Sequence, residues 1–287
     1  MSKKILVALV IVLAIINVFA FRQVLALAGP QYLQVEALDI GQGDAIFIKT
    51  SARRTILIDG GPDSAVLTKL AARLPFWQRT LDAIILTHPD ADHVMGLLEV
   101  LKKYQVDYIV WTGMMRNNAN YDQWLSLLKK AKQQGTQIII AHQGTKINSA
   151  GAVLEVLHPF ENVEGKFFKE SNDTGIVLRL DYGTASFLFT ADISSKIEGQ
   201  LVTTGAPLAI DVLKVAHHGS KYSTSEIFLE AAHPQFAVIS AGKDNSYGHP
   251  TPEVLQRLEE FGITVLRTDQ QGDVTFLSDG NHIQVKN

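Results

Sequence analysis

From Tyr32 to its C-terminus the chain alternates short apolar runs with longer amphipathic segments, and this alternation constrains the fold most strongly. An apolar run of four to eight residues bounded by glycine, aspartate or proline is typical of a buried strand. A longer segment with apolar residues every three or four positions is typical of a helix that covers a sheet. Regular alternation of the two therefore predicts an α/β fold.

The chain after Tyr32 divides into two halves, each of which begins with hairpin-like strands and continues into strand–helix units. We expect strands at 33–39, 45–49, 55–58, 83–86, 108–111 and 137–140 in the first half, and at 153–157, 176–181, 186–190, 212–215, 236–240, 264–266, 273–277 and 282–285 in the second. We expect helices at 64–74, 93–104, 121–134, 194–201, 224–231 and 252–261. Two such halves packed sheet against sheet, with their helices outside, predict a four-layer αββα sandwich.

A separate apolar segment precedes this alternation. Lys3 and Lys4 are followed by ILVALVIVLAIINVFAF, in which Asn17 is the only polar residue, and Arg22 ends the run. As a helix this run is ~25 Å long, slightly short of the ~30 Å hydrocarbon core of a membrane. We interpret it as an uncleaved signal-anchor that leaves the lysines in the cytoplasm and the remaining chain outside. The alternative is a secretory signal peptide with an Ala-x-Ala cleavage pattern at 26–28.

Composition removes several classes of chemistry. The 287 residues include no cysteine, which excludes disulfides, thiolate metal ligands and cysteine nucleophiles. A net charge of -3 gives no strong basic field for non-specific binding of nucleic acid. A local strip of basic residues would still be enough to bind it. Because 46% of the residues are hydrophobic, a sizeable core is available, and we expect one folded domain at 31–287 after the segment 1–30.

The loop after the expected strand 83–86 carries the densest group of metal-ligating side chains. The stretch LTHPDADHVMG contains His88, Asp90, Asp92 and His93 within six positions. An extended His-Pro-Asp places its first and third side chains on one face, and the other two residues lie where the chain turns into a helix. The array therefore suits two adjacent metal ions rather than one. A solvated loop in which Asp92 caps the helix is the alternative, and it explains one residue of the four.

Further candidate ligands follow other apolar strands, where α/β proteins place ligand-binding groups. Asp192 ends FLFTAD, and His217 and His218 follow VLKVA. A helix cap and a hydrogen-bonded turn are the structural alternatives for these residues. Asp59, in IDGG, is placed to orient a metal-binding histidine. His249, in NSYGHP, is a candidate for binding metal, contacting phosphate or donating a proton. We expect the other histidines to be surface or structural residues, namely His142, His158, His233 and His282.

Taken in order, these motifs resemble a known family. THPDADHVMG is similar to the H-x-H-x-D-H signature of the metallo-β-lactamase superfamily, with Asp90 in place of the second histidine. LDIGQGDAIFI, IDGG, THPDADH, the TAD ending, HHGS and NSYGHP together resemble the C-terminal metallo-hydrolase domain of ComEC, the competence DNA-uptake family. The resemblance does not include the multi-helix channel domain of that family. It implies a metallo-β-lactamase fold and a metal-dependent hydrolase.

The resemblance also implies a set of metal ligands for two divalent ions, Zn²⁺ or Mn²⁺. The implied set is His88 and Asp90 for one ion, Asp92 and His93 for the other, Asp192 as the bridge, and His217. At the third motif the superfamily usually has a histidine, whereas this chain has SNDTG, so that Asn172 or Asp173 stands there. This departure and Asp90 make the set richer in oxygen, which favours harder ions such as Mn²⁺.

The implied reaction is hydrolysis of a phosphodiester by a hydroxide that two metal ions generate from water. Asp92 would orient or deprotonate this water. Three histidines would stabilise the charge on phosphate or protonate the leaving oxygen, namely His217, His218 and His249. Single-stranded DNA, RNA and small phosphodiesters are all admissible substrates. The aromatic residues considered for stacking on bases are Trp111, Trp124, Tyr222 and Tyr247.

Two rival functions remain open at the level of the sequence. A lactone, amide or ester can be hydrolysed by the same chemistry, so the motifs do not fix the bond. A non-catalytic, membrane-anchored binding module would keep the fold with a degenerate site, and the complete ligand set argues against it. In each case we expect an extracytoplasmic domain, either held to the cytoplasmic membrane by 1–30 or secreted after cleavage.

Overall fold

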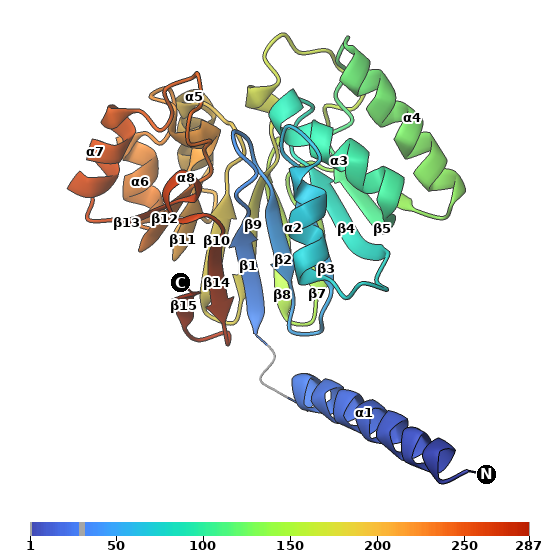
Figure 1. Cartoon of the computed structure of the whole chain (residues 1–287). Coiled ribbons are helices and arrows are strands. Elements are labelled where there is room, and N and C mark those ends of the chain that lie inside the picture. Colours follow the sequence, from blue (N-terminus) through green and yellow to red (C-terminus); the bar gives the residue numbers. More distant parts are fainter. Residues whose placement is uncertain (1, 29–31, 287) are drawn as a thin grey trace. The chain divides into compact units, whose positions relative to one another are not determined.

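The chain after Tyr32 forms two β-sheets that pack face to face, with helices on their outer surfaces (Figure 1). The computed structural model describes residues 2–28 and 32–286. The first sheet has the order β15-β14-β1-β2-β3-β4-β5-β6, and the second has the order β13-β12-β11-β10-β9-β8-β7. The strands of the first sheet are β1 (Leu33–Ala37), β2 (Ile46–Lys49), β3 (Thr55–Ile58), β4 (Thr80–Leu86), β5 (Gln105–Trp111), β6 (Gln137–Ile140), β14 (Val274–Ser278) and β15 (Ile283–Lys286). The strands of the second are β7 (Lys146–Ser149), β8 (Ala152–His158), β9 (Val177–Tyr182), β10 (Ala185–Phe189), β11 (Val212–Lys214), β12 (Phe236–Ile239) and β13 (Thr264–Arg267).

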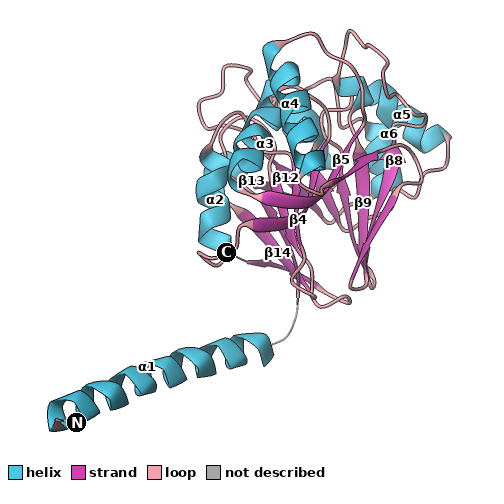
Figure 2. Cartoon of the chain, turned by 90° about the vertical axis from the view of Figure 1, so that its right-hand side faces the viewer, coloured by secondary structure: helices cyan, strands magenta, loops and turns pink. Residues whose placement is uncertain are grey.

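Helices cover both outer faces, and Figure 2 shows them from the side of α4. The helices that pack on the first sheet are α2 (Ala65–Arg73), α3 (Ala91–Lys103) and α4 (Ala119–Gln133). Those that pack on the second sheet are α5 (Ser195–Thr203), α6 (Glu226–Ala232) and α7 (Pro252–Glu260). Three shorter elements lie between the strands, namely α8 (Thr268–Gln271) and the 3-10 helices η1 (Asn172–Thr174) and η2 (Ala216–Gly219). The predicted four-layer αββα fold is confirmed.

The side chains of the central strands alternate between two apolar layers. In β10 the rings of Phe187 and Phe189 belong to the core between the sheets, whereas Leu188 packs against the helices of the second sheet. An extended strand needs this period of two when both of its faces are buried. Burial of a side chain of this size contributes about 1.5–3 kcal/mol, so both layers stabilise the domain.

Two strands from the C-terminus complete the first sheet, although the sequence suggested that they belong with the second half. β14 pairs antiparallel with β1, with Leu33 opposite Ser278, and therefore covers an edge that β1 would otherwise expose. Periodicity along the chain cannot show such long-range pairing. It also does not predict β7, because the residues of β7, KINS, are mostly polar and are exposed or only partly buried.

The parallel strands of each sheet bring their carboxyl ends together. β3, β4 and β5 are parallel neighbours in the first sheet, and β10, β11 and β12 are parallel neighbours in the second. In open α/β sheets, ligands bind outside the carboxyl ends of such strands. The loops that follow β3, β4, β10 and β11 carry most of the candidate ligands.

The N-terminal unit, Met1–Gln31, is described separately from the unit Tyr32–Asn287. It consists of α1 (Lys3–Ala28), in which the segment Lys3–Phe21 has a mean hydropathy of 2.8. By length and composition this segment can cross a membrane, and a signal sequence near an N-terminus would meet the same criterion. The expected domain boundary at residue 30 falls within residues 29–31, which lie outside the described residues.

Candidate metal centre

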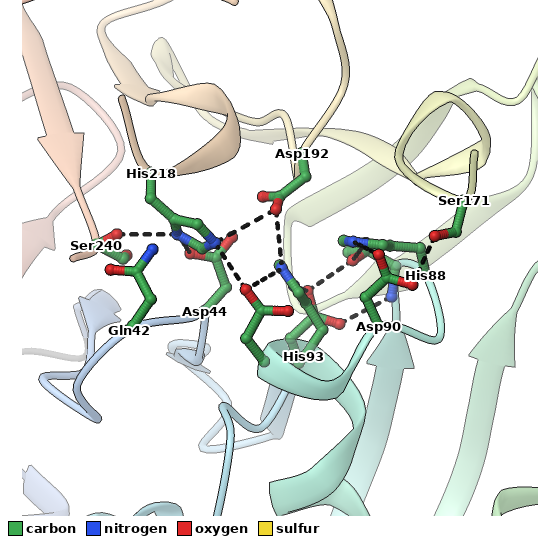
Figure 3. A network of polar contacts seen from close by, with 12 residues as sticks. Gln42, Asp44, His88, Asp90, His93, Ser171, Asp192, His218 and Ser240 are labelled. Carbon is green, nitrogen blue, oxygen red and sulfur yellow. Dashed lines mark hydrogen bonds and ion pairs between the residues drawn. The ribbon is translucent and has the colours of Figure 1, made fainter. Parts of the chain in front are cut away.

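The candidate ligands of the two halves meet at the carboxyl ends of the parallel strands (Figure 3). Asp59 follows β3, the loop with His88 follows β4, Asp192 follows β10, and His218 follows β11. A pocket of about 150 Å³ lies beside them and is lined by Gln42, Asp90, Asp92, Asn172, Asp192, His217, His218, Tyr247 and His249. Both sheets therefore contribute to one site.

Four side chains form its most compact part. Oδ2 of Asp192 lies 3.3 Å from Nε2 of His93 and 3.3 Å from Nε2 of His218. Oδ2 of Asp92 lies 3.3 Å from Nε2 of His218 and 4.0 Å from Nε2 of His93. One ligand atom from each of these residues lies within 4.8 Å of the others, a separation that a single cation can span.

A single buried carboxylate orients two of the imidazole rings. Nδ1 of His93 donates to Oδ2 of Asp59 at 2.8 Å. The hydroxyl of Thr87 donates to the same oxygen at 2.7 Å and lies 3.0 Å from Nδ1 of His88. Since the Nδ1 atoms of both rings face these partners, their Nε2 atoms are left to face the site. Such outer hydrogen bonds typically fix the orientation of metal-binding histidines.

The atoms that face the site are buried without a hydrogen-bond partner among the described residues. They are Nε2 of His88, Nε2 of His93, Nε2 of His218 and Oδ1 of Asp192. A buried polar atom without a partner is costly, and several converging ones indicate a bound group. Imidazole nitrogens and carboxylate oxygens are the ligands of Zn²⁺ and of Mn²⁺, so the residues present fit a divalent metal ion.

Asp90 lies at the edge of this cluster and is held by two neighbours. Its Oδ1 accepts from Nη2 of Arg116 at 2.8 Å and from the hydroxyl of Ser171 at 2.5 Å. Its Oδ2 lies 3.9 Å from Nε2 of His88. The residue before α3 is Asp90 and not Asp92, which lies in the first turn of the helix, and the side chain of Asp90 makes no capping hydrogen bond. A helix cap therefore does not account for this part of the loop.

The electrostatics of the cluster reflect an excess of carboxylates. Burial opposes the charged form of His93, but the carboxylates of Asp192 and Asp59 outweigh it and raise the pKa of His93 well above its ordinary value. Burial likewise opposes ionisation of Asp192, and the imidazoles of His218 and His93 outweigh it and lower the pKa of Asp192. For His88, burial and the neighbouring His93 lower the pKa, which keeps its ring neutral. The same negative field attracts a divalent cation.

The comparison with protein families shows to which family the chain belongs. Residues 38–243 match the model of the Metallo-beta-lactamase superfamily, which is more than half of the chain. The chain belongs to the metallo-β-lactamase superfamily.

Two relatives of this metallo-β-lactamase domain are named for competence or for the ComE operon. ComE operon protein 3 of Bacillus subtilis is 32% identical over 260 residues, which cover 85% of this chain and 33% of that protein. Competence protein ComA of Neisseria gonorrhoeae is 33% identical over 246 residues, which cover 84% of this chain and 32% of that protein. The chain thus spans about a third of the length of these relatives, and its resemblance to the competence family is confirmed.

Solved structures of the superfamily share the fold. The metallo-beta-lactamase fold protein YhfI from Bacillus subtilis has a TM-score of 0.53 at 16% sequence identity, and the match covers 82% of this chain and 96% of YhfI. At this level of identity the likeness extends to the fold alone.

Another buried ion pair contacts a histidine of the candidate metal site, and the sequence motifs did not predict it. Nζ of Lys214 donates to Oδ2 of Asp44, and Oδ1 of Asp44 lies 3.4 Å from Nδ1 of His218. Nδ1 of His218 also donates to the carbonyl oxygen of Ser240 at 2.9 Å. The signal in the sequence is a lysine inside the apolar run VLKVA, because a lysine on a buried strand requires a buried anion.

The loop that carries Asp44 lies directly against the loop that carries Asp92. The backbone N–H of Asp44 donates to the carbonyl oxygen of Asp92 at 3.2 Å. At Gly43, φ is +133°, and a Cβ there would lie 2.2 Å from that oxygen. The glycine of GQGD therefore permits the close approach that holds the two loops together.

The two adjacent histidines of HHGS take different positions. His218 is buried in the cluster, whereas His217 lines the pocket wall, with its ring 5.6 Å from that of His249. Both residues have a left-handed backbone, with φ of 50° for His217 and 54° for His218. Burial lowers the pKa of His217, and burial together with His217 lowers that of His249.

The third-motif residues also separate. Asn172 lines the pocket, while Asp173 accepts a hydrogen bond from the hydroxyl of Ser194 at 2.6 Å. Another histidine stands behind this motif, since Nδ1 of His158 donates to the carbonyl oxygen of Gly175 at 2.8 Å. His158 is buried and makes a structural contact, as the sequence suggested.

Proposed function

We propose that the chain is a metal-dependent phosphodiesterase that acts on nucleic acid. The observation that supports it most directly is the convergence of unpartnered Nε2 atoms on Asp192 at the mouth of a pocket. We assign Asp92, His93, Asp192 and His218 to the centre of the metal site, with His88 and Asp90 completing a second position beside it. In this assignment His218 takes the ligand position that the motif comparison gave to His217.

When bound, divalent metal ions would lower the pKa of a water molecule and neutralise charge on phosphate. The residues of the chain have separate tasks. Asp92 is partly exposed in the pocket, so its carboxylate is placed to orient the attacking water and accept its proton. His217 and His249 line the same pocket, where their ring nitrogens can donate to the phosphate oxygens.

Two exposed aromatic side chains, one of which lines the pocket, favour a nucleic-acid substrate. Tyr247 is exposed, lines the pocket and stacks on His249 with ring centroids 6.0 Å apart. Tyr222 is exposed as well, with the Lys221 ammonium 5.3 Å from its ring centre. An aromatic face beside a cation suits a single strand, because bases stack and phosphates need a positive partner. Trp111 and Trp124 are buried in the core and are excluded from this role.

We further propose that α1 anchors the enzyme in the cytoplasmic membrane with the hydrolase domain on the extracytoplasmic side. The length and hydropathy of Lys3–Phe21 support the anchor. Lys3 and Lys4 support the orientation, because basic residues are retained on the cytoplasmic side.

A substrate panel tests the proposed reaction. The full chain, purified in detergent and loaded with Mn²⁺ or Zn²⁺, is assayed on bis-p-nitrophenyl phosphate, single-stranded DNA, a β-lactam and a lactone. We expect hydrolysis of the phosphodiesters, its loss in Asp192→Asn, and no change in His282→Ala, a matched control on the exposed surface. Turnover of the lactone or β-lactam alone would replace the proposal with the rival bond specificity. No turnover by a metal-loaded protein would favour a binding module.

A further inference from the structure

One loop of the domain exposes two large aromatic side chains side by side. Phe76 is 80% exposed and Trp77 is 57% exposed, and their rings meet edge to face with centroids 4.8 Å apart. Soluble surfaces seldom display such a pair, since each ring leaves a large apolar area in water. Neither residue lies in the pocket or in the cluster described above.

Strand pairing places this loop at the end of the first sheet opposite to the metal centre. The loop leads into β4 at Thr80, and the metal-binding loop leaves β4 at its other end. Since β3 and β4 are parallel, the residues before Thr55 lie at the same end as the aromatic pair. β1 also begins there, because Gln34 lies opposite Lys49, and Lys49 lies opposite Thr55. The chain therefore enters the domain at the end that carries the aromatic pair.

Two loops and the last turn of α3 carry basic residues at this end. The segments 50–54, 74–79 and 102–104 contain no acidic residue, and their basic residues are Arg53, Arg54, Arg79, Lys102 and Lys103. Arg54 pairs with Asp82, and Lys102 pairs with Glu99. Among the described residues, Arg79 and Lys103 form no ion pair, and both are exposed. The aromatic pair and these basic residues therefore lie at the same end of the first sheet.

We propose that this end of the domain docks on an anionic phospholipid surface. Tryptophan and phenylalanine partition into the interface between headgroups and acyl chains, where the indole N–H still finds a partner. Arginine and lysine extend their charged ends towards lipid phosphates. A bilayer offers both environments at once, and the segment before β1 is the helix proposed above to span one. The metal centre, at the other end of the strands, then opens away from the membrane towards the aqueous phase.

Trp77 is a built-in reporter for this contact. The chain has three tryptophans, α1 contains none, and both Trp111 and Trp124 are buried. The full chain is reconstituted in vesicles of phosphatidylcholine with phosphatidylglycerol, in which part of the phosphatidylcholine carries bromine on its acyl chains. Trp77→Phe is measured in parallel, and the difference between the two spectra isolates the emission of Trp77. We expect this emission to lie at shorter wavelength in the anionic vesicles than in vesicles of phosphatidylcholine alone, and the brominated lipid to reduce it roughly two-fold.

A double variant and a change of lipid separate lipid docking from other causes of shielding. Arg79→Glu with Lys103→Glu should largely restore the emission of Trp77, because these exposed residues supply the attraction to anionic headgroups, and vesicles of phosphatidylcholine alone should do the same. If Trp77 is quenched by aqueous acrylamide as fully in anionic vesicles as in detergent, the proposal is wrong. If it is shielded from acrylamide without quenching by brominated lipid, a protein surface covers it and the proposal is also wrong. Hydrolysis of bis-p-nitrophenyl phosphate is measured on the same samples, so failure of the proposed reaction is seen separately.

Discussion

Oδ2 of Asp192 lies 3.3 Å from Nε2 of His93, and this contact joins the loop after β10 in the second sheet to the first turn of α3 on the first sheet. Two buried groups this close require either a shared proton or a shared cation. When the ring of His93 is neutral and its Nδ1 donates to Asp59, the lone pair of Nε2 is directed at the carboxylate. A metal ion between the two satisfies both atoms.

The first prediction concerns the ligand at this contact. Asp192→Asn removes a negative charge from a buried site, and we expect it to weaken Mn²⁺ binding by at least roughly 100-fold, since even outer-shell changes cost about 10–100-fold. The measurement is equilibrium dialysis of the full chain with Mn²⁺ over a range of concentrations. His282→Ala serves as control, because His282 is exposed and pairs with Asp279 far from the site. Unchanged affinity in Asp192→Asn would remove Asp192 from the ligand set.

A second prediction concerns the buried pair of Lys214 and Asp44. Lys214→Met leaves Asp44 buried without its cation, and we expect the free energy of unfolding to fall by ~3–5 kcal/mol. The double variant with Asp44→Leu should recover much of this loss, because no buried charge is then left unpaired. Urea unfolding of the three proteins measures the difference. Equal destabilisation in the single and double variants would show that the pair is not coupled.

The third prediction distinguishes the hydrogen bond that positions Asp90 from the binding of metal by Asp90 itself. Arg116→Ala leaves Oδ1 of Asp90 held by Ser171 alone, and we expect a roughly 10-fold loss of affinity for one metal ion with little effect on the other. Arg116→Lys should restore part of it, since a lysine supplies charge without the planar donor geometry. Dialysis against a competing chelator resolves the two binding steps. Loss of both ions in Arg116→Ala would instead indicate a collapse of the loop.

The fourth prediction is a dependence of stability on pH that arises away from the metal centre. Burial alone would raise the pKa of Asp273, but hydrogen bonds from Lys69, Arg73 and the backbone of Asp39 lower it below its ordinary value. The folded state thus binds fewer protons than the unfolded state. The stabilisation is complete above the unfolded pKa of ~3.9 and is lost as the pH falls through the folded value.

Asp273→Asn should therefore lower the free energy of unfolding at pH 7 by roughly 1–2 kcal/mol and flatten its decline below about pH 4. Urea unfolding at a series of pH values, compared with the unmodified chain, measures both effects. Parallel curves for the two proteins would show that Asp273 has the same pKa in both states.

The layers of this fold can be predicted from the sequence because buried positions recur at regular intervals along its strands and helices. The alternation in β10 and the amphipathic helices follow directly from such local patterns. The pairing of β14 with β1 does not, because it depends on which edge is left uncovered after folding. α8 is a single turn, too short for a helical period to appear in the sequence.

The candidate site likewise contains some residues that the sequence predicts and others that it does not. The candidate ligands between His88 and His93 lie close together both in the sequence and in the folded domain. The choice between His217 and His218 depends on the left-handed backbone of HHGS, which turns one ring into the cluster and the other to the pocket wall. Asp44 sits in a loop with no motif for metal binding, and its role is visible only when Lys214 is placed beside it.

The metal content of the full chain tests the account most directly. Protein purified without a metal-affinity resin is dialysed against Mn²⁺ or Zn²⁺, passed through a desalting column and measured by elemental analysis, together with a His93→Ala variant of verified fold. We predict about two ions per chain for the unmodified protein and a marked loss in the variant. Metal content at background level in the unmodified chain, or equal content in both proteins, would contradict the metal centre and the hydrolysis that depends on it.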